Sequence, residues 1–247
     1  MSEGTRRERI RAATEMEIRQ HARTLLIEQG RDAVTLRAIA RELGITAPAL
    51  YRYYDSREDL LRQLGEDICG DLVDELSERL REIDQRDFHG KLRSVCHGFR
   101  RWALAHPKEF GLVFATRADE TAEPGADGAG PEGARDQFAG VFLRLIGPLM
   151  AESTHVVDRE SAPASLQSEL SPNQLALAEA FSQHGIDLPA EAQDTDAVYF
   201  LLRWWVRIYG HVALEVFGRF PFTLAHSDRL YESLLDELAH ELGLTTG

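Results

Sequence analysis

The sequence predicts an all-α protein, on two observations. Apolar residues recur at the three- and four-residue spacing of helix faces along nearly the whole chain. No segment between turn signals shows a convincing alternation of apolar and polar residues with the period of a half-buried strand. At 247 residues and 43% hydrophobic, the chain can bury a substantial core in one domain or two unequal ones. We therefore expect helices joined by loops throughout.

The first helix is expected from about Arg7 to Gln29. Gly30 follows where a left-handed C-terminal cap belongs, since glycine has no Cβ to clash in that conformation. The inward face of this helix is formed by Ile18, Ala22, Leu25 and Leu26.

A second and a third helix follow, separated by Gly44. Thr35 can cap the second helix and Thr46 the third, and Pro48 lies in the first turn of the third, where proline is tolerated. The second helix turns inward Leu36, Ile39, Ala40 and Leu43, and the third turns inward Leu50 and Tyr54.

A long fourth helix begins after Asp55. Ser56 and Asp59 have the spacing of a capping box, in which a side chain satisfies a backbone N–H of the first turn. Three helices and the start of the fourth thus occupy about 65 residues, and we expect a domain boundary there, giving domains 1–65 and 66–247. The inward face of the fourth helix is formed by Leu60, Leu61, Leu64, Ile68 and Leu72.

Two later segments lose the helical periodicity. Residues 118–136 consist largely of Gly, Ala, Pro and acidic residues, with no large apolar side chain to bury. Residues 153–172 are rich in Ser and contain Pro163 and Pro172. We expect both segments to be mobile loops between helices.

The charge is unevenly distributed along the chain. The net charge is −13, yet residues 1–65 contain 12 Arg and no Lys against 10 acidic residues, a balance of +2 that leaves −15 for the remainder. This asymmetry suits a protein whose N-terminal end contacts an anion while the acidic body keeps it soluble.

Several functional classes are not expected. No apolar run approaches the roughly 20 residues of a membrane span, and the charged N-terminus has no apolar segment typical of a signal peptide. Cys69 and Cys96 form no CxxC pair, so neither a disulfide framework nor a metal site is predicted. None of the nucleophile, phosphate-loop, dinucleotide or zinc-protease motifs occurs, so we expect no enzyme, no catalytic residues and no cofactor.

Residues 35–54, TLRAIARELGITAPALYRYY, contain the parts of a helix-turn-helix in order. A short helix, a turn with glycine and a second helix follow one another, and the start of such a second helix enters the major groove of DNA. The small residues Ala47, Pro48 and Ala49 allow close approach to base edges, and the exposed N–H groups of a helix start favour a phosphate.

The residues that follow supply donors for DNA. The phenols of Tyr51 and Tyr53 can reach phosphate oxygens while their rings pack on the domain, without a net positive charge. Arg37 and Arg52 are the long donors near the small residues, and a bidentate arginine–guanine pair contributes about 1–3 kcal/mol of discrimination. We expect Tyr54 in the core; the alternative for the other two tyrosines is a purely structural aromatic cluster.

Residues from about 10 to 65 resemble the TetR family of bacterial transcriptional regulators. The residues that carry the resemblance are Thr35, Ile39, Ala40, Leu43, Gly44, Ile45, Thr46, Leu50, Tyr51, Tyr53, Tyr54, Arg57, Glu58, Asp59 and Leu60. Tyr53 stands where the family often has histidine, and Arg57 where it often has lysine. The resemblance implies phosphate contacts by Thr35, Thr46, Tyr51, Tyr53 and Arg57, and base-facing positions for Arg37, Ala47, Pro48, Ala49 and Arg52.

The C-terminal part suits a dimer. One recognition helix contacts few base pairs, so specificity requires a second copy one DNA turn away in a symmetric dimer. The last helix could pair with residues 198–216, so that two protomers form a four-helix interface; the alternative is a monomer whose core buries this segment. The segment is apolar on one face through Val198, Leu201, Leu202, Trp205, Ile208, Tyr209, Val212 and Val216, and on a second through Phe200 and Trp204; the last helix carries Leu230, Leu234, Leu238 and Leu242.

Residues from about 90 to 245 resemble a subgroup of TetR C-terminal domains named for a Trp and a His-Gly pair. Tyr209 stands at the histidine position, and His211 follows Gly210. The residues that carry the resemblance are Trp205, Tyr209, Gly210, Leu214 and Glu215, with His106, Pro107 and Phe110. A TetR-like body implies a mainly apolar ligand cavity. Its candidate lining residues are His97, Trp102, Phe110, Phe114, Phe142, Trp205 and Tyr209, most of which could equally be core.

The sequence thus predicts an N-terminal three-helix helix-turn-helix DNA-binding domain followed by a larger helical ligand-binding and dimerisation domain. The predicted function is a homodimeric repressor in the bacterial cytoplasm, associated with the nucleoid when bound to DNA. A small, mainly apolar molecule would release it from a palindromic operator in double-stranded DNA. The alternatives are a ligand-activated transcriptional activator and a helical dimeric scaffold that binds a protein, which would show no salt-dependent affinity for DNA.

Overall fold

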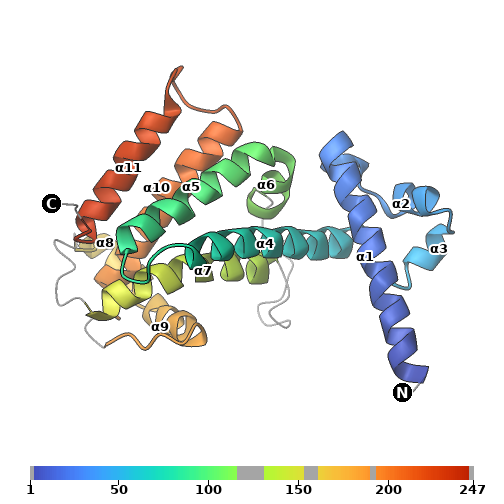
Figure 1. The fold of residues 1–247 in the computed structure, drawn as a ribbon, viewed down its shortest axis with the longest axis horizontal. Coiled ribbons are helices and arrows are strands. Elements are labelled where there is room, and N and C mark those ends of the chain that lie inside the picture. The colour runs from blue at the N-terminus through green and yellow to red at the C-terminus, as the bar shows by residue number, and fades with distance from the viewer. Residues whose placement is uncertain (1–2, 116–130, 153–160, 190–192, 245–247) are drawn as a thin grey trace. The chain divides into compact units, whose positions relative to one another are not determined.

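The computed structural model describes residues 3–115, 131–152, 161–189 and 193–244, and these residues form helices with no strand among them (Figure 1). The predicted all-α class is confirmed. No helix within these ranges combines the length and apolarity needed to cross a bilayer. In chain order the elements are α1 (Glu3–Gln29), a 3₁₀ turn η1 (Arg31–Ala33), α2 (Leu36–Leu43), α3 (Ala47–Leu50), α4 (Arg57–Arg81), α5 (Phe88–Ala105), α6 (Pro107–Phe114), α7 (Pro131–Glu152), α8 (Ala164–Leu170), α9 (Asn173–Gln183), α10 (Thr195–Val216) and α11 (Ser227–Glu241).

The chain divides into two compact units. The first comprises residues Met1–Asp71 and His106–Asp136, and the second comprises Leu72–Ala105 and Gln137–Gly247. Each unit therefore combines two separate stretches of the sequence. The predicted division into a DNA-binding domain of residues 1–65 and a ligand-binding domain of residues 66–247 stays a prediction.

The first unit is built around α1, which packs against η1, α2 and α6, while α2 packs against α3. The inward residues expected from the helical spacing are buried, except Leu43, which is half-buried. Those of α1 to α3 are Ile18, Ala22, Leu25, Leu26, Leu36, Ile39, Ala40 and Leu50, with Tyr54 just after α3.

Local signals fix the turn between α2 and α3. Thr35 caps α2, since its hydroxyl oxygen accepts the N–H of Ala38 at 3.1 Å. Gly44 ends α2 with φ 66° and ψ 24°, a left-handed conformation that glycine adopts without a steric penalty. Thr46 precedes α3 as expected, but its side chain makes no capping hydrogen bond.

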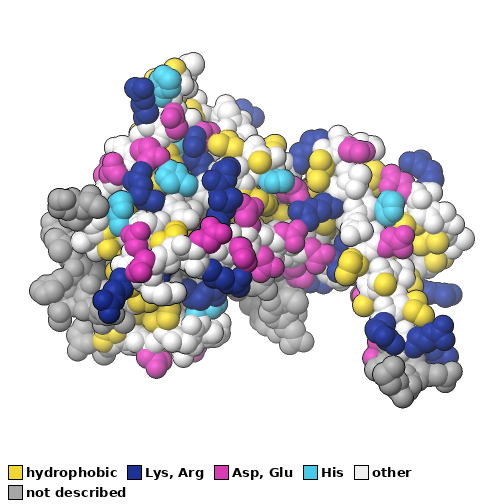
Figure 2. All heavy atoms as spheres, in the orientation of Figure 1, with side chains coloured by type: hydrophobic (Ala, Val, Ile, Leu, Met, Phe, Trp, Pro, Cys, Tyr) yellow, Lys and Arg dark blue, Asp and Glu magenta, His cyan; other side chains and the backbone are white. Residues whose placement is uncertain are grey.

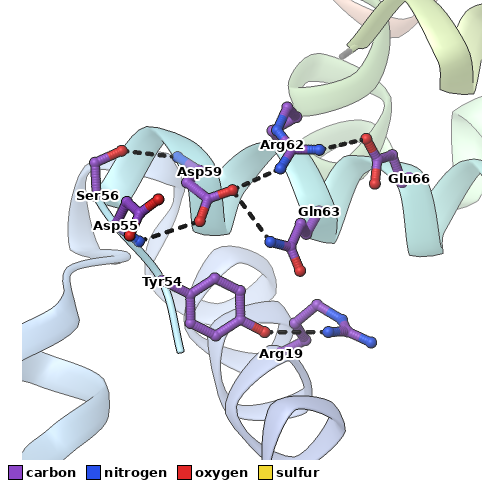
Figure 3. A network of polar contacts seen from close by, with 8 residues as sticks. All are labelled: Arg19, Tyr54, Asp55, Ser56, Asp59, Arg62, Gln63 and Glu66. Atoms are coloured by element: carbon purple, nitrogen blue, oxygen red, sulfur yellow. Dashed lines mark hydrogen bonds and ion pairs between the residues drawn. The ribbon is translucent and has the colours of Figure 1, made fainter. Parts of the chain in front are cut away.

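The start of α4 is held by a polar network (Figure 3). The hydroxyl of Ser56 accepts the N–H of Asp59 at 3.0 Å, as the capping box predicts, and the Asp59 carboxylate accepts the N–H of Asp55 at 3.2 Å. Burial works against ionisation of Asp59, but hydrogen bonds from Gln63, Arg62 and the Asp55 N–H outweigh it and lower its pKa.

Ion pairs and hydrogen bonds connect helix α6 to α1 within the first unit, although some 80 residues separate the contacting residues. Glu109 is only 2% exposed, and its carboxylate accepts from Arg23 at 2.7 Å and lies 2.6 Å from the ring of His106. Arg23 also pairs with Asp71 of α4. The ammonium of Lys108 donates to two carbonyl oxygens in the last turn of α1, at 2.6 and 3.0 Å, and so satisfies acceptors that a helix end leaves open.

The second unit is organised around α10, which packs against α5, α8, α9 and α11, while α11 also packs against α5. Of the two apolar faces predicted for α10, the one with Phe200 and Trp204 is buried, whereas on the other Leu202 is exposed and Leu201, Trp205 and Tyr209 are half-buried. Its fully buried residues are Ala197, Phe200, Trp204, Ile208, His211 and Val212.

Two expected loops are partly helical. Helix α7 already begins at Pro131, so the prediction of a loop over 118–136 is wrong for residues 131–136; proline is tolerated at a helix start, and helix formers follow it. Helix α8 occupies residues 164–170 of the second expected loop. Leu170 is buried and Leu166 half-buried one turn earlier, so contacts with the rest of the unit hold this turn helical. Residues 118–130 and 153–160 lie outside the described residues.

Candidate DNA interface and ligand-binding core

Helix α3 presents small residues at its start. Thr46 and Pro48 are exposed, Ala47 and Ala49 are half-buried, and Leu50 is buried and anchors the helix in the core. The first turn of α3 itself therefore carries only short side chains. This is the geometry that close contact with base edges requires.

The tyrosines after α3 have different environments. Tyr54 is buried, and its phenol donates to the carbonyl of Glu15 at 3.2 Å. The phenol also accepts from Arg19 at 3.1 Å (Figure 3). The prediction that Tyr54 belongs to the core is confirmed. Tyr51 is 57% exposed and Arg52 is exposed, so a core cluster does not account for Tyr51.

Tyr53 lies against α1. It is half-buried, and the guanidinium carbon of Arg11 lies 5.8 Å from its ring centroid. Arg11 also reaches within 3.5 Å of the Arg52 carbonyl and pairs with Glu15 at 2.7 Å. Arg11 was not among the DNA-binding residues predicted from the sequence, although residues 6–11 contain four arginines.

Two other phosphate candidates also have structural roles. The Arg57 guanidinium donates to the carbonyls of Val34 and Arg31, each at 2.7 Å, and so holds the turn η1. Its third nitrogen lies 3.5 Å from Glu58. Thr35 uses its hydroxyl oxygen for the cap of α2, and its hydroxyl hydrogen stays available to an acceptor. Arg37 is exposed on α2. The phosphate and base roles of these residues stay predictions.

Three ligand-binding candidates come together in an aromatic cluster of the second unit. Phe142 of α7 and Trp205 of α10 lie 6.1 Å apart between ring centroids, and Tyr209 stacks on Trp205 at 6.1 Å with an interplanar angle of 8°. Phe138 adds to the cluster, with centroids 5.3 Å from Phe142 and 5.7 Å from Trp205, and Phe99 of α5 lies 4.6 Å from Phe138. We call these five residues the aromatic cluster.

The other ligand-binding candidates have different neighbours. His97 contacts α11, with its ring 5.9 Å from that of Tyr231 and its Nε2 3.3 Å from Glu232. Burial and nearby arginines lower the His97 pKa against the opposing effect of Glu232. Phe110 and Phe114 of α6 pack on each other at 5.1 Å and belong to the first unit. Trp102 of α5 is buried.

A half-buried ion pair between α5 and α10, with a buried histidine beside it, was not predicted. Glu215 accepts two hydrogen bonds from Arg100, at 2.7 and 2.5 Å, and one from Ser227 at 2.7 Å. Burial alone would raise the pKa of Glu215, but these hydrogen bonds outweigh it, and the Glu215 pKa is lowered. His211 is 6% exposed, and its Nε2 has no hydrogen-bond partner among the described residues but lies 3.7 Å from Glu215.

The ring of His211 packs between two aromatic side chains. Its centroid lies 4.9 Å from that of Tyr231 and 5.3 Å from that of Phe220. Burial, together with the charge of Arg100, lowers the His211 pKa despite the nearby Glu215. The adjacent Gly210 drew attention to His211 in the sequence, but nothing local indicated its burial.

Comparisons with known proteins agree with this architecture. A family model described as "Bacterial regulatory proteins, tetR family" matches residues 18–64, and one described as "Tetracyclin repressor-like, C-terminal domain" matches residues 92–238. The HTH-type transcriptional regulators Rv1816 of Mycobacterium tuberculosis and Mb1846 of Mycobacterium bovis are each 25% identical to the chain over 217 residues, which cover 88% of this chain and 86% of each relative.

Two solved structures share the fold. The crystal structure of the protein SCO4313 aligns with a TM-score of 0.66 and 25% identity, over 94% of this chain and 98% of that one. A protein of unknown function from Rhodococcus sp. RHA1 aligns with a TM-score of 0.61 and 17% identity, over 94% and 95%. The likeness therefore extends over both units of the chain.

Proposed function

Because the chain belongs to the TetR family of bacterial transcriptional regulators, we propose that it is a homodimeric repressor of the bacterial cytoplasm, released from a palindromic operator by a small, mainly apolar ligand. Its family makes it a DNA-binding regulator of transcription and not an enzyme. The dimer, the operator symmetry, the ligand and the direction of regulation are parts of the proposal.

The observation that carries the DNA-binding part is the surface formed by α3 and the residues after it. Leu50 and Tyr54 anchor this segment in the core, while Tyr51 and Arg52 project from it and the first turn of α3 carries only short side chains. A buried anchor and an exposed, sterically open edge are what a recognition helix needs in order to enter the major groove without deforming.

We assign two kinds of contact to this surface. Arg37 and Arg52 are proposed to read base edges, because only long donors reach past the small residues Ala47 to Ala49. The phosphate contacts are assigned to Thr35, Thr46, Tyr51, Tyr53 and Arg57. Arg57 has two of its nitrogens engaged with backbone carbonyls, so its phosphate contact would use the third.

An apolar stripe on α10 supports the dimer. Leu202, Val206 and Leu214 are exposed at intervals of four or eight residues, and Val206 is 58% exposed. Gly210 stands between them on the same face, with open space where a Cβ would lie, so a second helix could approach closely. Leu230 of α11 is exposed as well. An apolar face of this kind is costly in water and is typical of an interface.

The aromatic cluster supports the ligand-binding part. Phe142, Trp205 and Tyr209 lie together and combine aromatic rings with one phenol, a composition suited to a mainly apolar molecule with a single polar group. Trp205 and Tyr209 belong to α10, the helix assigned to the dimer. A ligand that moved α10 would change the spacing of the two recognition helices, and by linkage DNA would weaken ligand binding by the same factor.

The test is selection of bound fragments from random duplex DNA by the purified full chain, followed by affinity measurements over a salt series. We expect a palindrome, two protomers per site and a steep decrease of affinity with salt, because phosphate contacts release counterions. The selected duplex then serves as the probe in a screen for the releasing ligand. A folded dimer that enriches no sequence in the absence or presence of candidate ligands would contradict the proposal and favour a protein-binding scaffold.

A further inference from the structure

Helix α1 extends well beyond the residues that it buries. Its first buried residue is Ile18, whereas the described side chains from residue 6 to residue 13 are all exposed. At about 1.5 Å per residue, the stretch from residue 6 to Ile18 spans roughly 18 Å. Figure 1 shows this N-terminal half of α1 continuing past α2 and α3.

The exposed stretch is strongly basic. Residues 6–11, RRERIR, contain four arginines and one glutamate, a balance of +3 in a chain whose net charge is −13. Figure 2 shows Lys and Arg side chains gathered near this end of the chain. We call residues 6–11 the basic arm. None of its side chains is buried, so a contribution to the core does not explain why the helix is this long.

One face of the basic arm adjoins the predicted DNA-binding surface. Arg11 lies against the ring of Tyr53 and reaches the carbonyl of Arg52, so this face of α1 is next to the segment that follows α3. Arg7 is one turn earlier on the same face, since residues four apart are neighbours on a helix. Arg6 points about 100° away from Arg7 around the axis.

We propose that the basic arm is a second DNA contact, in which Arg7 and Arg11 bind phosphates next to the base pairs that α3 reads. The inference rests on the proposed function and adds residues to its DNA interface. A guanidinium donates two parallel hydrogen bonds to a phosphate, and it does so without any demand on base sequence.

Two observations favour duplex DNA over an acidic protein as the occupant. The arm is continuous with the surface of Tyr53 and Arg52, so a duplex bound there already brings phosphates near it. The charge of the arm is complementary to a polyanion and opposite to that of the chain's own acidic remainder.

The tetR-family match begins at residue 18, so the arm precedes the segment that the family model describes.

The test compares the full chain with Arg7→Gln and with Arg6→Gln on the selected operator. Both variants remove one exposed positive charge from the same turn, but only Arg7 shares the face of Arg11. Each phosphate contact contributes about 0.9 to the slope of log affinity against log salt, so Arg7→Gln in a dimer should reduce the slope by roughly 2. Arg6→Gln should change it by much less. Circular dichroism confirms that both variants stay helical.

Hydroxyl-radical footprinting locates the contact. We expect Arg7→Gln to lose protection at the backbone positions next to the arm, which the wild-type chain protects. Protection of the base pairs read by α3 should be the same in both chains. An unchanged slope and footprint in Arg7→Gln, with the operator still bound, would overturn the arm contact and leave the proposed function intact. If the wild-type chain itself enriched no DNA, the proposed function would fail first.

Discussion

Tyr51, Tyr53 and Tyr54 are near neighbours in the chain, yet each phenol has a different environment. Tyr54 is buried between Glu15 and Arg19, Tyr53 packs against Arg11, and Tyr51 extends into solvent. The same chemical group thus serves as a core anchor at one position and is available to a phosphate at another. The backbone turn after α3 makes this division, because it rotates successive side chains to different faces.

The first prediction separates base reading from phosphate contact. Arg52→Ala should reduce the preference for the operator over a scrambled duplex by about 1–3 kcal/mol, since a base-reading arginine is lost. Tyr51→Phe should weaken binding to both duplexes by a similar factor, because a phosphate contact carries no sequence information. Fluorescence anisotropy with the two duplexes measures both effects. Equal loss of preference in the two variants would contradict the assigned roles.

The second prediction concerns His211 and pH. Burial and Arg100 lower the His211 pKa in the folded chain, while Glu215 opposes this and Tyr231 packs on the ring. As pH falls, the unfolded chain therefore takes up the proton first. The stability due to neutral His211 is present above about pH 6.5 and is lost below it, with a slope of up to about 1.4 kcal/mol per pH unit.

The measurement compares the wild-type chain with His211→Phe, which keeps an aromatic ring but does not titrate. Urea unfolding of both at several pH values from 8 to 5 gives the difference in unfolding free energy. We expect that difference to shift in favour of the variant below about pH 6.5, whatever its value at pH 8. Parallel curves over this range would show that His211 is not buried neutral.

At the scale of elements, the turn between α2 and α3 depends on one backbone conformation. Gly44 has φ 66°, which costs an ordinary residue about 1–2 kcal/mol, although no atom would block a Cβ there. Gly44→Ala should therefore destabilise the chain by about 1 kcal/mol. Gly70→Ala is the matched control, because Gly70 lies inside α4 with equally open space, and alanine should stabilise that helix by up to about 1 kcal/mol.

Urea unfolding followed by circular dichroism compares the two variants. The shift of the unfolding midpoint should have opposite signs for Gly44→Ala and Gly70→Ala. If both variants gained stability, the left-handed conformation at Gly44 would not be a constraint on the turn.

Elements with local signals could be predicted from the sequence, and those held by distant contacts could not. Thr35, Gly44 and Ser56 fix helix ends through atoms within four residues, and these ends agree with the prediction. Helix α8 was missed because it depends on burial of Leu170 against residues far away in the chain, while its composition is that of a loop.

The candidate sites follow the same distinction. The exposure of Tyr51 and the burial of Tyr54 followed from the spacing of apolar residues before α4. The contact of Arg11 with Tyr53 spans 42 residues, and the hydrogen bonds of Arg57 to the η1 turn span more than 20. No pattern among neighbouring residues of the sequence predicts contacts over such distances. The buried His211 depends in the same way on α11 and on the chain between α10 and α11.

At the scale of the whole molecule, dimer formation should depend on the stripe on α10. A symmetric interface contains every residue twice, so Val206→Glu would place two carboxylates in an apolar contact. We expect the dimer dissociation constant to rise at least about 100-fold, from lost burial of both valines and the cost of desolvating the charges. Affinity for the palindromic operator should fall with it.

Sedimentation equilibrium over a range of concentrations measures this change. Leu175→Glu is the control, because Leu175 is 75% exposed on α9 and lies outside the stripe. It should leave the dimer unchanged. A Val206→Glu chain that stays dimeric at nanomolar concentration would exclude this face of α10 from the interface.

The fastening of α6 to α1 bears on how such regulators can be recombined. A chimera that transplanted residues 1–65 alone onto a foreign body would leave Arg23 without Glu109 and Asp71, and would strip Lys108 from the carbonyls that end α1. The smallest exchangeable cassette is therefore discontinuous in the gene. A chimera made with a single crossover would combine α1 of one protein with α6 of the other. The contact between α1 and α6 therefore has to be redesigned whenever the N-terminal helices are exchanged.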